Sequence, residues 1–224
     1  MSNLEIEHTA DGSTTLFVKD LDEHYHSVKG AITESEHIYR DCAFLHKCSL
    51  TPTPSHLRLL EIGFGTGLNA CVTAKATETC RHTLHYFSIE KYPLDTNVIS
   101  ALNHCNYVDS TLHESIHAVP WNKTCQITPN FTIEKIHADL LTVELPTDID
   151  VVYFDAFAPE KQPEMWSKEI FTRIYSSMKP GGIMTTYCAK GAIRRLLIEC
   201  GFMVERIPGP INGKREILRA TKQV

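Results

Sequence analysis

The 224-residue sequence has no apolar run long enough to span a bilayer, and its first residues lack the charged and apolar regions of a secretory signal peptide. Its eight cysteines include no Cys-x-x-Cys pair, which argues against a disulfide framework and against a zinc site. It also contains no internal repeat and no low-complexity tract. We therefore expect a cytoplasmic protein without a membrane segment, and the hydrophobic content of 42% is enough for one core.

Patterns that bind metals are also scarce. His24, His26 and His37 lie close together in the sequence, but no carboxylate pattern accompanies them. Histidines on a loop without such a pattern are more often surface or hydrogen-bonded residues than metal ligands. We therefore expect no metal.

Basic residues are scarce in most of the chain and concentrated near its end. From Lys168 onward the sequence has eleven basic and four acidic residues, a net charge of +7, whereas the whole chain carries −5 and residues 1–167 therefore −12. Phosphates are contacted by local Lys and Arg residues rather than by net charge. The C-terminal segment is thus compatible with a nucleic-acid-binding edge, and equally with an ordinary solvated face.

The most informative feature present is a glycine-rich turn after an apolar segment. Residues 59–62 predict a buried strand, and Gly63, Gly65 and Gly67 follow it in alternation. A turn of this kind between a strand and a helix makes room for a nucleotide-like ligand at the edge of an α/β sheet. The spacing differs from the dinucleotide fingerprint, whose third glycine would stand at Leu68. A glycine-rich turn that binds nothing is the alternative interpretation.

Carboxylates stand at or next to the ends of this strand and of two later apolar segments, 85–90 and 131–137. Glu61 lies two residues before the first glycine, and Glu90 ends the segment 85–90. Glu90 has about the separation from the glycines at which nucleotide-binding folds keep a ribose-binding carboxylate. Asp139 follows the apolar segment 131–137. A solvated loop carboxylate is the more frequent role for any one of them, but three at consecutive strand ends favour a binding site.

The remaining pattern is that of an α/β protein. Short apolar segments alternate with longer helical patterns, which is typical of a parallel sheet covered by helices on both faces. We expect the last strand to run antiparallel after a turn at residues 209–213. The seven predicted strands are residues 58–62, 85–89, 131–137, 150–154, 183–187, 202–206 and 216–221.

Residues 1–50 lie outside this alternation. Asp11-Gly12 predicts a hairpin turn between strands at 4–6 and 14–18, and residues 33–40 are expected to begin a helix. We therefore predict a small N-terminal extension that contains β structure, residues 1–50, followed by one α/β domain, residues 51–224.

Residues 155–166 follow the fourth predicted strand and carry the candidate chemistry. They read Asp-x-Phe-x-Pro-x-Lys-x-Pro-x-Met-Trp, from Asp155 to Trp166. An acidic residue at the end of this strand can accept a hydrogen bond from an amine and orient its lone pair. A helix N-cap is the alternative role for Asp155.

Two resemblances follow from these motifs. Glu-x-Gly-x-Gly-x-Gly, from Glu61 to Gly67, is similar to motif I of the class I S-adenosyl-L-methionine methyltransferases. Together with residues 155–166, residues 190–196 and the late Gly-Lys-Arg-Glu at 213–216, it resembles the MnmC/MnmD family of tRNA methyltransferases. That family completes 5-methylaminomethyl-2-thiouridine at the tRNA wobble position, and the resemblance covers its methyltransferase domain. Its FAD-dependent oxidoreductase domain has no counterpart in this sequence.

The family resemblance implies a Rossmann-like seven-stranded sheet, S-adenosyl-L-methionine as cofactor and the tRNA anticodon stem-loop as partner. The implied reaction converts 5-aminomethyl-(2-thio)uridine to its methylaminomethyl form, with Asp155 as the catalytic residue that accepts a hydrogen bond from the amine. The implied cofactor-binding residues are Tyr25, Glu61, Gly63, Gly65, Gly67, Glu90, Asp139 and Asp155. The implied substrate- and RNA-binding residues are Phe157, Lys190, Arg194, Arg195, Lys214 and Arg215.

Two alternatives remain open at this point. One is another class I transferase that acts on a small amine or hydroxyl, including an aminopropyltransferase. The other is a non-catalytic protein that binds S-adenosyl-L-methionine and assists a tRNA-modifying enzyme. Titration with labelled cofactor and with tRNAs at different stages of modification would distinguish them.

Overall fold

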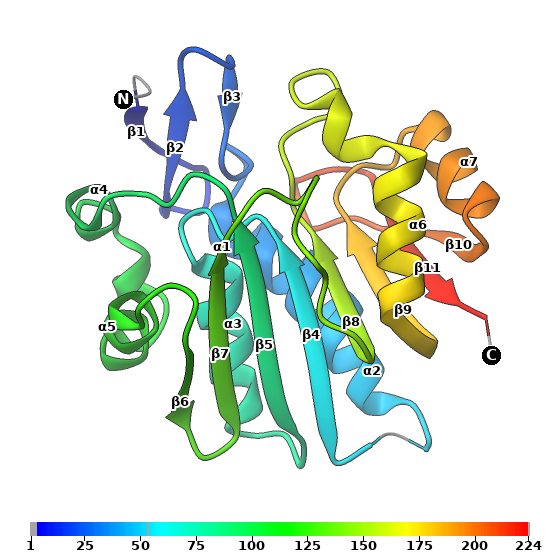
Figure 1. Cartoon of the computed structure of the whole chain (residues 1–224). Helices are drawn as coiled ribbons and strands as arrows, with labels where there is room; N and C mark the ends of the chain where they lie inside the picture. Colours follow the sequence, from blue (N-terminus) through cyan, green and yellow to red (C-terminus); the bar gives the residue numbers. More distant parts are fainter. Residues whose placement is uncertain (1–3, 53, 224) are drawn as a thin grey trace.

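The computed structural model describes residues 4–52 and 54–223 and contains two β-sheets (Figure 1). A small antiparallel sheet has the order β1-β2-β3, and the main sheet of eight strands has the order β10-β11-β9-β8-β4-β5-β7-β6. The strands are β1 (Leu4–His8), β2 (Thr14–Val18), β3 (Glu23–His24), β4 (His56–Ile62), β5 (Thr83–Glu90), β6 (Thr124–Thr128), β7 (Phe131–His137), β8 (Ile149–Phe154), β9 (Met178–Thr186), β10 (Phe202–Pro208) and β11 (Glu216–Lys222).

The main sheet confirms the predicted fold class, with one strand more than expected. All seven predicted strands are present, and β11 lies antiparallel between β10 and β9 as expected. The additional strand is β6, which pairs antiparallel with β7 at the sheet edge. All five of its residues are half-buried or exposed. The apolar pattern that marked the other strands is therefore weak here, and the prediction of seven strands was wrong by this edge strand.

Helices cover both faces of the main sheet (Figure 1). The segment from α1 through η1 packs with α3 on one face, and α6 and α7 cover β9 and β10 on the other. The helices are α1 (Ala31–Glu34), the π-helix η1 (Ser35–Leu45), α2 (His46–Ser49), α3 (Leu68–Thr77), α4 (Thr96–Ser100), the short 3₁₀ helix η2 (His104–Asn106), α5 (Ser110–Ala118), the 3₁₀ helix η3 (Pro163–Trp166), α6 (Lys168–Ser177) and α7 (Gly191–Glu199).

Strand β4 contributes side chains to the hydrophobic clusters on both faces of the main sheet. Successive side chains of a strand point to opposite faces of the sheet. Leu57 and Leu59 accordingly join the cluster formed with η1 and α3, whereas Leu60 and Ile62 join the cluster formed with α6 and α7. All four side chains are fully buried. Burial on both faces explains why apolar residues of β4 stand next to one another, as Leu59 and Leu60 do, and not only at alternate positions.

The N-terminal extension has two parts with different roles. The predicted hairpin is present, because β1 pairs antiparallel with β2 around the Asp11-Gly12 turn. The helical part carries Ile38, Tyr39 and Phe44, which are buried in the same cluster as residues of the main sheet. The first strand of the main sheet begins at His56, close to the predicted boundary at residue 50. The helical part of the extension nevertheless contributes to the core of the main domain.

The order in which strands are added to the sheet reverses at β4. After β4 the chain builds β5 and β7 on one side, and then crosses to β8 and β9 on the other. The five strands are parallel, so their carboxyl ends lie at one edge. In open α/β sheets a crevice forms at this edge where the strand order reverses.

No helix among the described residues is long and apolar enough to cross a membrane.

Candidate functional site

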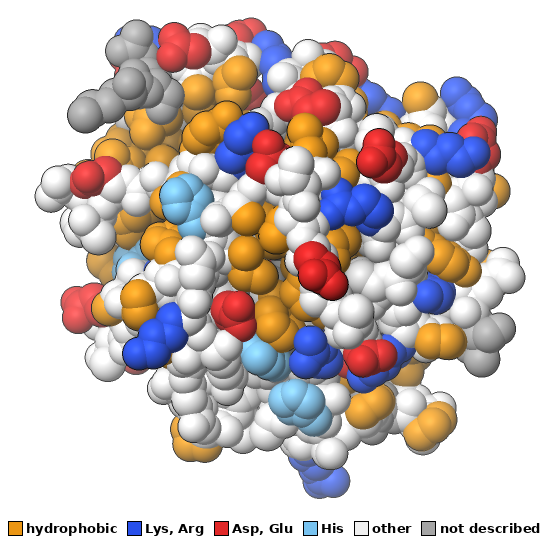
Figure 2. Space-filling view, viewed as in Figure 1, with side chains coloured by type: hydrophobic (Ala, Val, Ile, Leu, Met, Phe, Trp, Pro, Cys, Tyr) orange, Lys and Arg blue, Asp and Glu red, His pale blue; other side chains and the backbone are white. Residues whose placement is uncertain are grey.

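A cavity of about 400 Å³ lies at the carboxyl edge of the main sheet. On the face shown in Figure 2, apolar side chains gather in a central hollow that acidic and basic side chains border. The lining residues come from the glycine turn, from the ends of β5, β7, β8 and β9, and from the segment 23–28 of the N-terminal extension. A volume of this size falls in the range of small-molecule sites.

The glycine turn has the backbone that its sequence predicts. Gly63, Gly65 and Gly67 all have positive φ, which residues with a side chain rarely adopt. At Gly63 a Cβ atom would also lie 2.7 Å from the Asp155 carbonyl oxygen. At Gly65 it would lie 3.0 Å from the ring of Tyr25. The turn is therefore packed closely between the end of β8 and the N-terminal extension.

Glu90 lies directly beneath this turn. One carboxylate oxygen accepts a hydrogen bond from the Gly65 backbone N–H at 3.1 Å, and the other accepts one from the Tyr92 N–H at 2.7 Å. Asp139 lines the same side of the cavity and forms a 2.8 Å ion pair with Lys91, which lowers its pKa. The structure thus brings Glu90, Asp139 and the glycines together, as the sequence predicts.

Glu61, on β4, and Gly67, in the turn, do not line the cavity. Glu61 is fully buried, and Ser88 donates a 2.6 Å hydrogen bond to it. Burial raises the pKa of Glu61 to about 8. Gly67 packs against the ring of His117. Both residues support the turn from behind, which differs from the direct cofactor contact expected for them.

Two buried histidines bind the N-terminal extension to the rest of the domain, His26 at the glycine turn and His104 at η2. His26 Nε2 lies 2.6 Å from the Thr66 hydroxyl, and His104 Nε2 lies 2.7 Å from the Thr14 carbonyl oxygen. Burial lowers the pKa of His26 to about 3 and that of His104 to about 4, so both rings are neutral at pH 7. His24 and His37 have other partners, the Glu7 carboxylate and the Pro208 carbonyl oxygen.

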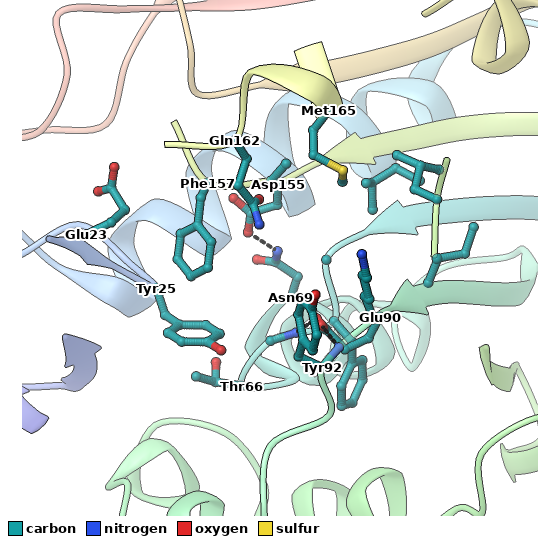
Figure 3. A pocket seen from close by; sticks show the side chains of 18 of the residues that line it. Glu23, Tyr25, Thr66, Asn69, Glu90, Tyr92, Asp155, Phe157, Gln162 and Met165 are labelled. Atoms are coloured by element: carbon teal, nitrogen blue, oxygen red, sulfur yellow. Dashed lines mark hydrogen bonds between the residues drawn. The ribbon is translucent and has the colours of Figure 1, made fainter. Parts of the chain in front are cut away.

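Asp155 follows β8 and faces the cavity (Figure 3). Tyr39 donates a 2.6 Å hydrogen bond to one carboxylate oxygen, and the Asn69 amide donates one of 2.8 Å to the other. Desolvation by the surrounding protein and the nearby Glu34 raise the pKa of Asp155 to about 7. A group that changes its charge near neutral pH can exchange a proton with a bound substrate.

Aromatic rings border the cavity beside Asp155. The rings of Tyr25 and Phe157 meet edge to face with centroids 5.1 Å apart. The Tyr187 hydroxyl donates a 2.9 Å hydrogen bond to the Ala156 carbonyl oxygen, and Trp166 donates one of 2.7 Å to the Phe157 carbonyl oxygen. These contacts hold the segment after β8 as one wall of the cavity.

Four residues of the site were missed by the sequence analysis. Tyr39, Asn69, Glu34 and Tyr187 all surround Asp155, but the sequence analysis assigned a site role to none of them. Asn69 lies two residues after Gly67, in the first turn of α3, and this closeness to the glycine turn was the available signal.

The predicted basic residues occupy different positions. Lys190 pairs with Glu160, which lies in the segment after β8. Arg195 and Arg215 are exposed, and Arg194 is half-buried. Lys214 differs from them because it lines the cavity.

The donor and acceptor groups of the cavity fit a nucleoside-based cofactor. The buried Asn69 side-chain oxygen has no hydrogen-bond partner among the described residues. Carboxylates stand at the glycine end of the cavity, and the glycine turn leaves its backbone accessible. No cluster of metal-ligating side chains is present in the described parts of the chain. The site thus offers acceptors for hydroxyl, amino and ammonium groups.

Comparison with known sequences supports this interpretation. A profile of the family described as S-adenosyl-L-methionine-dependent methyltransferase matches residues 105–223. The tRNA 5-methylaminomethyl-2-thiouridine biosynthesis bifunctional protein MnmC of Pseudomonas putida is 30% identical over 209 residues, which is 88% of this chain and 32% of that protein. The protein of the same name from Campylobacter hominis is 28% identical over 216 residues, 92% of this chain and 31% of its own length. The chain therefore spans about a third of these relatives.

Solved structures show a similar fold. The crystal structure of MNMC2 from Aquifex aeolicus matches with a TM-score of 0.80 and 27% identity, over 100% of this chain and 71% of that one. Spermidine synthase from Thermotoga maritima matches with a TM-score of 0.57 at 13% identity, over 99% of this chain and 80% of that one, which shows a shared fold alone.

Proposed function

Because this chain belongs to the S-adenosyl-L-methionine-dependent methyltransferase family, we propose that it methylates the primary amine of 5-aminomethyl-2-thiouridine at the wobble position of tRNA. The observation that carries the proposal is the position of Asp155, an acidic group with a pKa near neutrality beside the glycine turn. The similarity to MnmC and to MNMC2 supports the choice of tRNA as substrate.

The cofactor would lie along the glycine turn. Glu90 would accept hydrogen bonds from the ribose hydroxyls, and Asp139 one from the adenine amino group. Asn69 and the backbone around Gly63 would face the methionine portion. S-adenosyl-L-methionine supplies an activated methyl group on a positively charged sulfur, and the sulfur keeps the bonding electrons when the methyl leaves.

The protein's own task is to align the acceptor amine and to manage one proton. An alkylamine resembles lysine, whose reference pKa is about 10.4, so its lone pair is mostly protonated in neutral water. Asp155 would accept a hydrogen bond from the neutral amine and direct its lone pair toward the methyl group. After the new N–C bond forms, the nitrogen is positively charged, and its surplus proton passes to Asp155 and then to solvent.

The proposed activity is tested with tRNA that carries 5-aminomethyl-2-thiouridine. We expect the purified protein with S-adenosyl-L-methionine to form the methylaminomethyl nucleoside, as detected by mass analysis of nucleosides. Unmodified tRNA should remain unchanged, because it lacks the amine. Methylation of free alkylamines with the modified tRNA left unreacted would reject tRNA as the substrate.

A second prediction concerns the tRNA-binding surface. Arg195 and Arg215 are exposed, and Arg215 follows Lys214 at the edge of the cavity. Replacing both by Gln should weaken tRNA binding and reduce the slope of log affinity against log salt by about 0.7–0.9 for each lost phosphate contact. Filter binding at several salt concentrations measures this slope.

A matched control is Lys75→Gln in the last turn of α3, at the end away from the glycine turn. It removes one exposed positive charge and should leave the salt slope unchanged. An unaltered slope in the Arg195 and Arg215 double variant would place the RNA surface elsewhere.

A further inference from the structure

Lys214 lies on the turn between β10 and β11, which returns its side chain to the cavity. This turn is tight, because the Gly209 N–H donates a 3.0 Å hydrogen bond to the Arg215 carbonyl oxygen and the Gly213 N–H donates one of 3.0 Å to that of Pro210. A Cβ atom at Gly209 would lie 1.8 Å from the Lys214 carbonyl oxygen, so the turn requires glycine there.

The Lys214 ammonium is held between a carboxylate and an aromatic face. Its Nζ lies 3.6 Å from Glu34 Oε1 and 3.6 Å from the centroid of the Tyr187 ring. The other Glu34 oxygen accepts a 2.8 Å hydrogen bond from the Ser27 backbone N–H, which fixes the carboxylate. The Glu34 side chain is only 9% exposed, whereas that of Lys214 is 42% exposed. Lys214 thus partners a nearly buried negative charge in the cavity wall.

These contacts resemble the way in which proteins bind alkylammonium ions, with a carboxylate for the charge and an aromatic face for the cation. Without Lys214, Glu34 and Asp155 would present two carboxylates to an incoming aminomethyl group. A site of that kind favours the protonated amine, which has no lone pair to react. With Lys214 in place, Glu34 already has a positively charged partner and does not attract the protonated substrate.

We propose that Lys214 pairs with Glu34 and places a fixed positive charge at the end of the cavity near Asp155, here called the acceptor end. The substrate amine then binds to Asp155 in its neutral form. This inference rests on the proposed function, because it concerns the amine of that reaction. The proton of the free ammonium goes to solvent as the amine enters. Lys214 is a positioning residue, since it acts through Glu34 and the local charge.

The charges around Asp155 agree with this role. Glu34 raises the pKa of Asp155, and Lys214 lowers it. The protonation of Asp155 therefore depends on the Glu34–Lys214 pair, whose two charges shift its pKa in opposite directions. The other titratable groups that interact with Asp155, Tyr187 or Lys214 are Glu23, Tyr39, Glu61 and Cys188, from four different segments.

The test is the pH dependence of single-turnover methylation at saturating tRNA and cofactor. Lys214→Met keeps the apolar stem but removes the charge, and should raise the apparent pKa of the rate by about one pH unit, which slows the reaction about tenfold on the acidic limb. Lys214→Arg keeps the charge and should restore the wild-type profile. Glu34→Gln removes the opposite charge and should lower the apparent pKa by about one pH unit.

A second readout does not need the reaction. NMR of carboxyl-labelled aspartate, with the Asp155 signal assigned by its loss in Asp155→Asn, should show a higher Asp155 pKa in the ligand-free Lys214→Met protein. If Glu34→Gln does not fold, the Met and Arg variants of Lys214 decide the question between them.

The outcomes separate this inference from the proposed function. If wild-type enzyme methylates the aminomethyl tRNA but Lys214→Met keeps both the wild-type pH profile and the Asp155 pKa, the inference is wrong. A weaker tRNA affinity and a smaller salt slope in that variant would then identify Lys214 as a phosphate contact. A wild-type enzyme inactive on this tRNA would overturn the proposed function, and this inference with it.

Discussion

Asp155→Asn should slow single-turnover methylation of aminomethyl-uridine tRNA by about 10²–10⁴-fold, the usual size of a general-base and orientation effect. The amide has nearly the same shape, but it has no charge to stabilise the developing ammonium and cannot take its proton. Quenched-flow mixing followed by nucleoside mass analysis measures the rate. Near-normal conversion would contradict a catalytic role for Asp155.

The contacts of Asp155 indicate that this variant can fold. Tyr39 can still donate to the amide oxygen at position 155. Asn69 now faces an NH₂ group, but its own buried side-chain oxygen has no partner within residues 4–52 and 54–223 and can accept from that group once the amide rotates. We therefore expect a small loss of stability together with retained tRNA binding.

Asp150→Asn is the matched control, because it makes the same change at a buried aspartate on β8, the strand that Asp155 follows. Asp150 lies at the start of β8, where it pairs with Lys179 at 3.1 Å and accepts a hydrogen bond from the Arg58 N–H. Its replacement should lower the free energy of unfolding and leave the rate of methyl transfer in the folded protein near normal. A rate loss equal to that of Asp155→Asn would show that the effect is structural.

Glu90→Ala should weaken S-adenosyl-L-methionine binding by about 10- to 100-fold, since a hydrogen bond to a charged group contributes about 1.5–3 kcal/mol. The carboxylate also accepts from the backbone N–H groups of Gly65 and Tyr92, so its loss removes both the ribose acceptor and a support of the glycine turn. Titration calorimetry with the cofactor measures the affinity. An unchanged dissociation constant would show that the ribose lies elsewhere.

Asp95→Ala provides the comparison for Glu90. Asp95 caps the N-terminus of α4 through a 2.8 Å hydrogen bond to the Asn97 N–H and does not line the cavity. Its loss should cost about 1 kcal/mol of stability without a change in cofactor affinity. The pair of variants distinguishes a contact with the cofactor from a general loosening of the loops after β5.

Local patterns in the sequence were sufficient for much of this site. A run of apolar residues predicts a buried strand, and glycines behind it predict a turn with positive φ, because both signals depend on neighbouring residues. Parallel strands then bring their carboxyl ends to one edge, which is why the sequence alone predicts that Glu90, Asp139 and Asp155 lie together. The half-exposed edge strand β6 was missed because it lacks such a run.

The surroundings of Asp155 depend on contacts between residues far apart in the chain. Tyr39 and Asn69 are 116 and 86 positions away from it, and no local period links residues at such distances. Periodicity determines the face on which a side chain lies, but only packing of the N-terminal helix against the sheet determines that Tyr39 meets Asp155. Glu61 was likewise predicted at the right strand end, yet its side chain is fully buried and does not line the cavity.

Lys214 shows the same division most clearly. Its position in a basic C-terminal segment predicted contact with phosphates. Composition gives the charge of a segment, but it does not show where a side chain points. The tertiary structure folds the turn between β10 and β11 over the cavity, where Lys214 meets Glu34 and Tyr187. The sequence by itself thus determined the fold class, the glycine turn and the acidic residues at the strand ends. Only the tertiary structure decided which charges face one another, because those pairs form through long-range packing of α1, β9 and the turn.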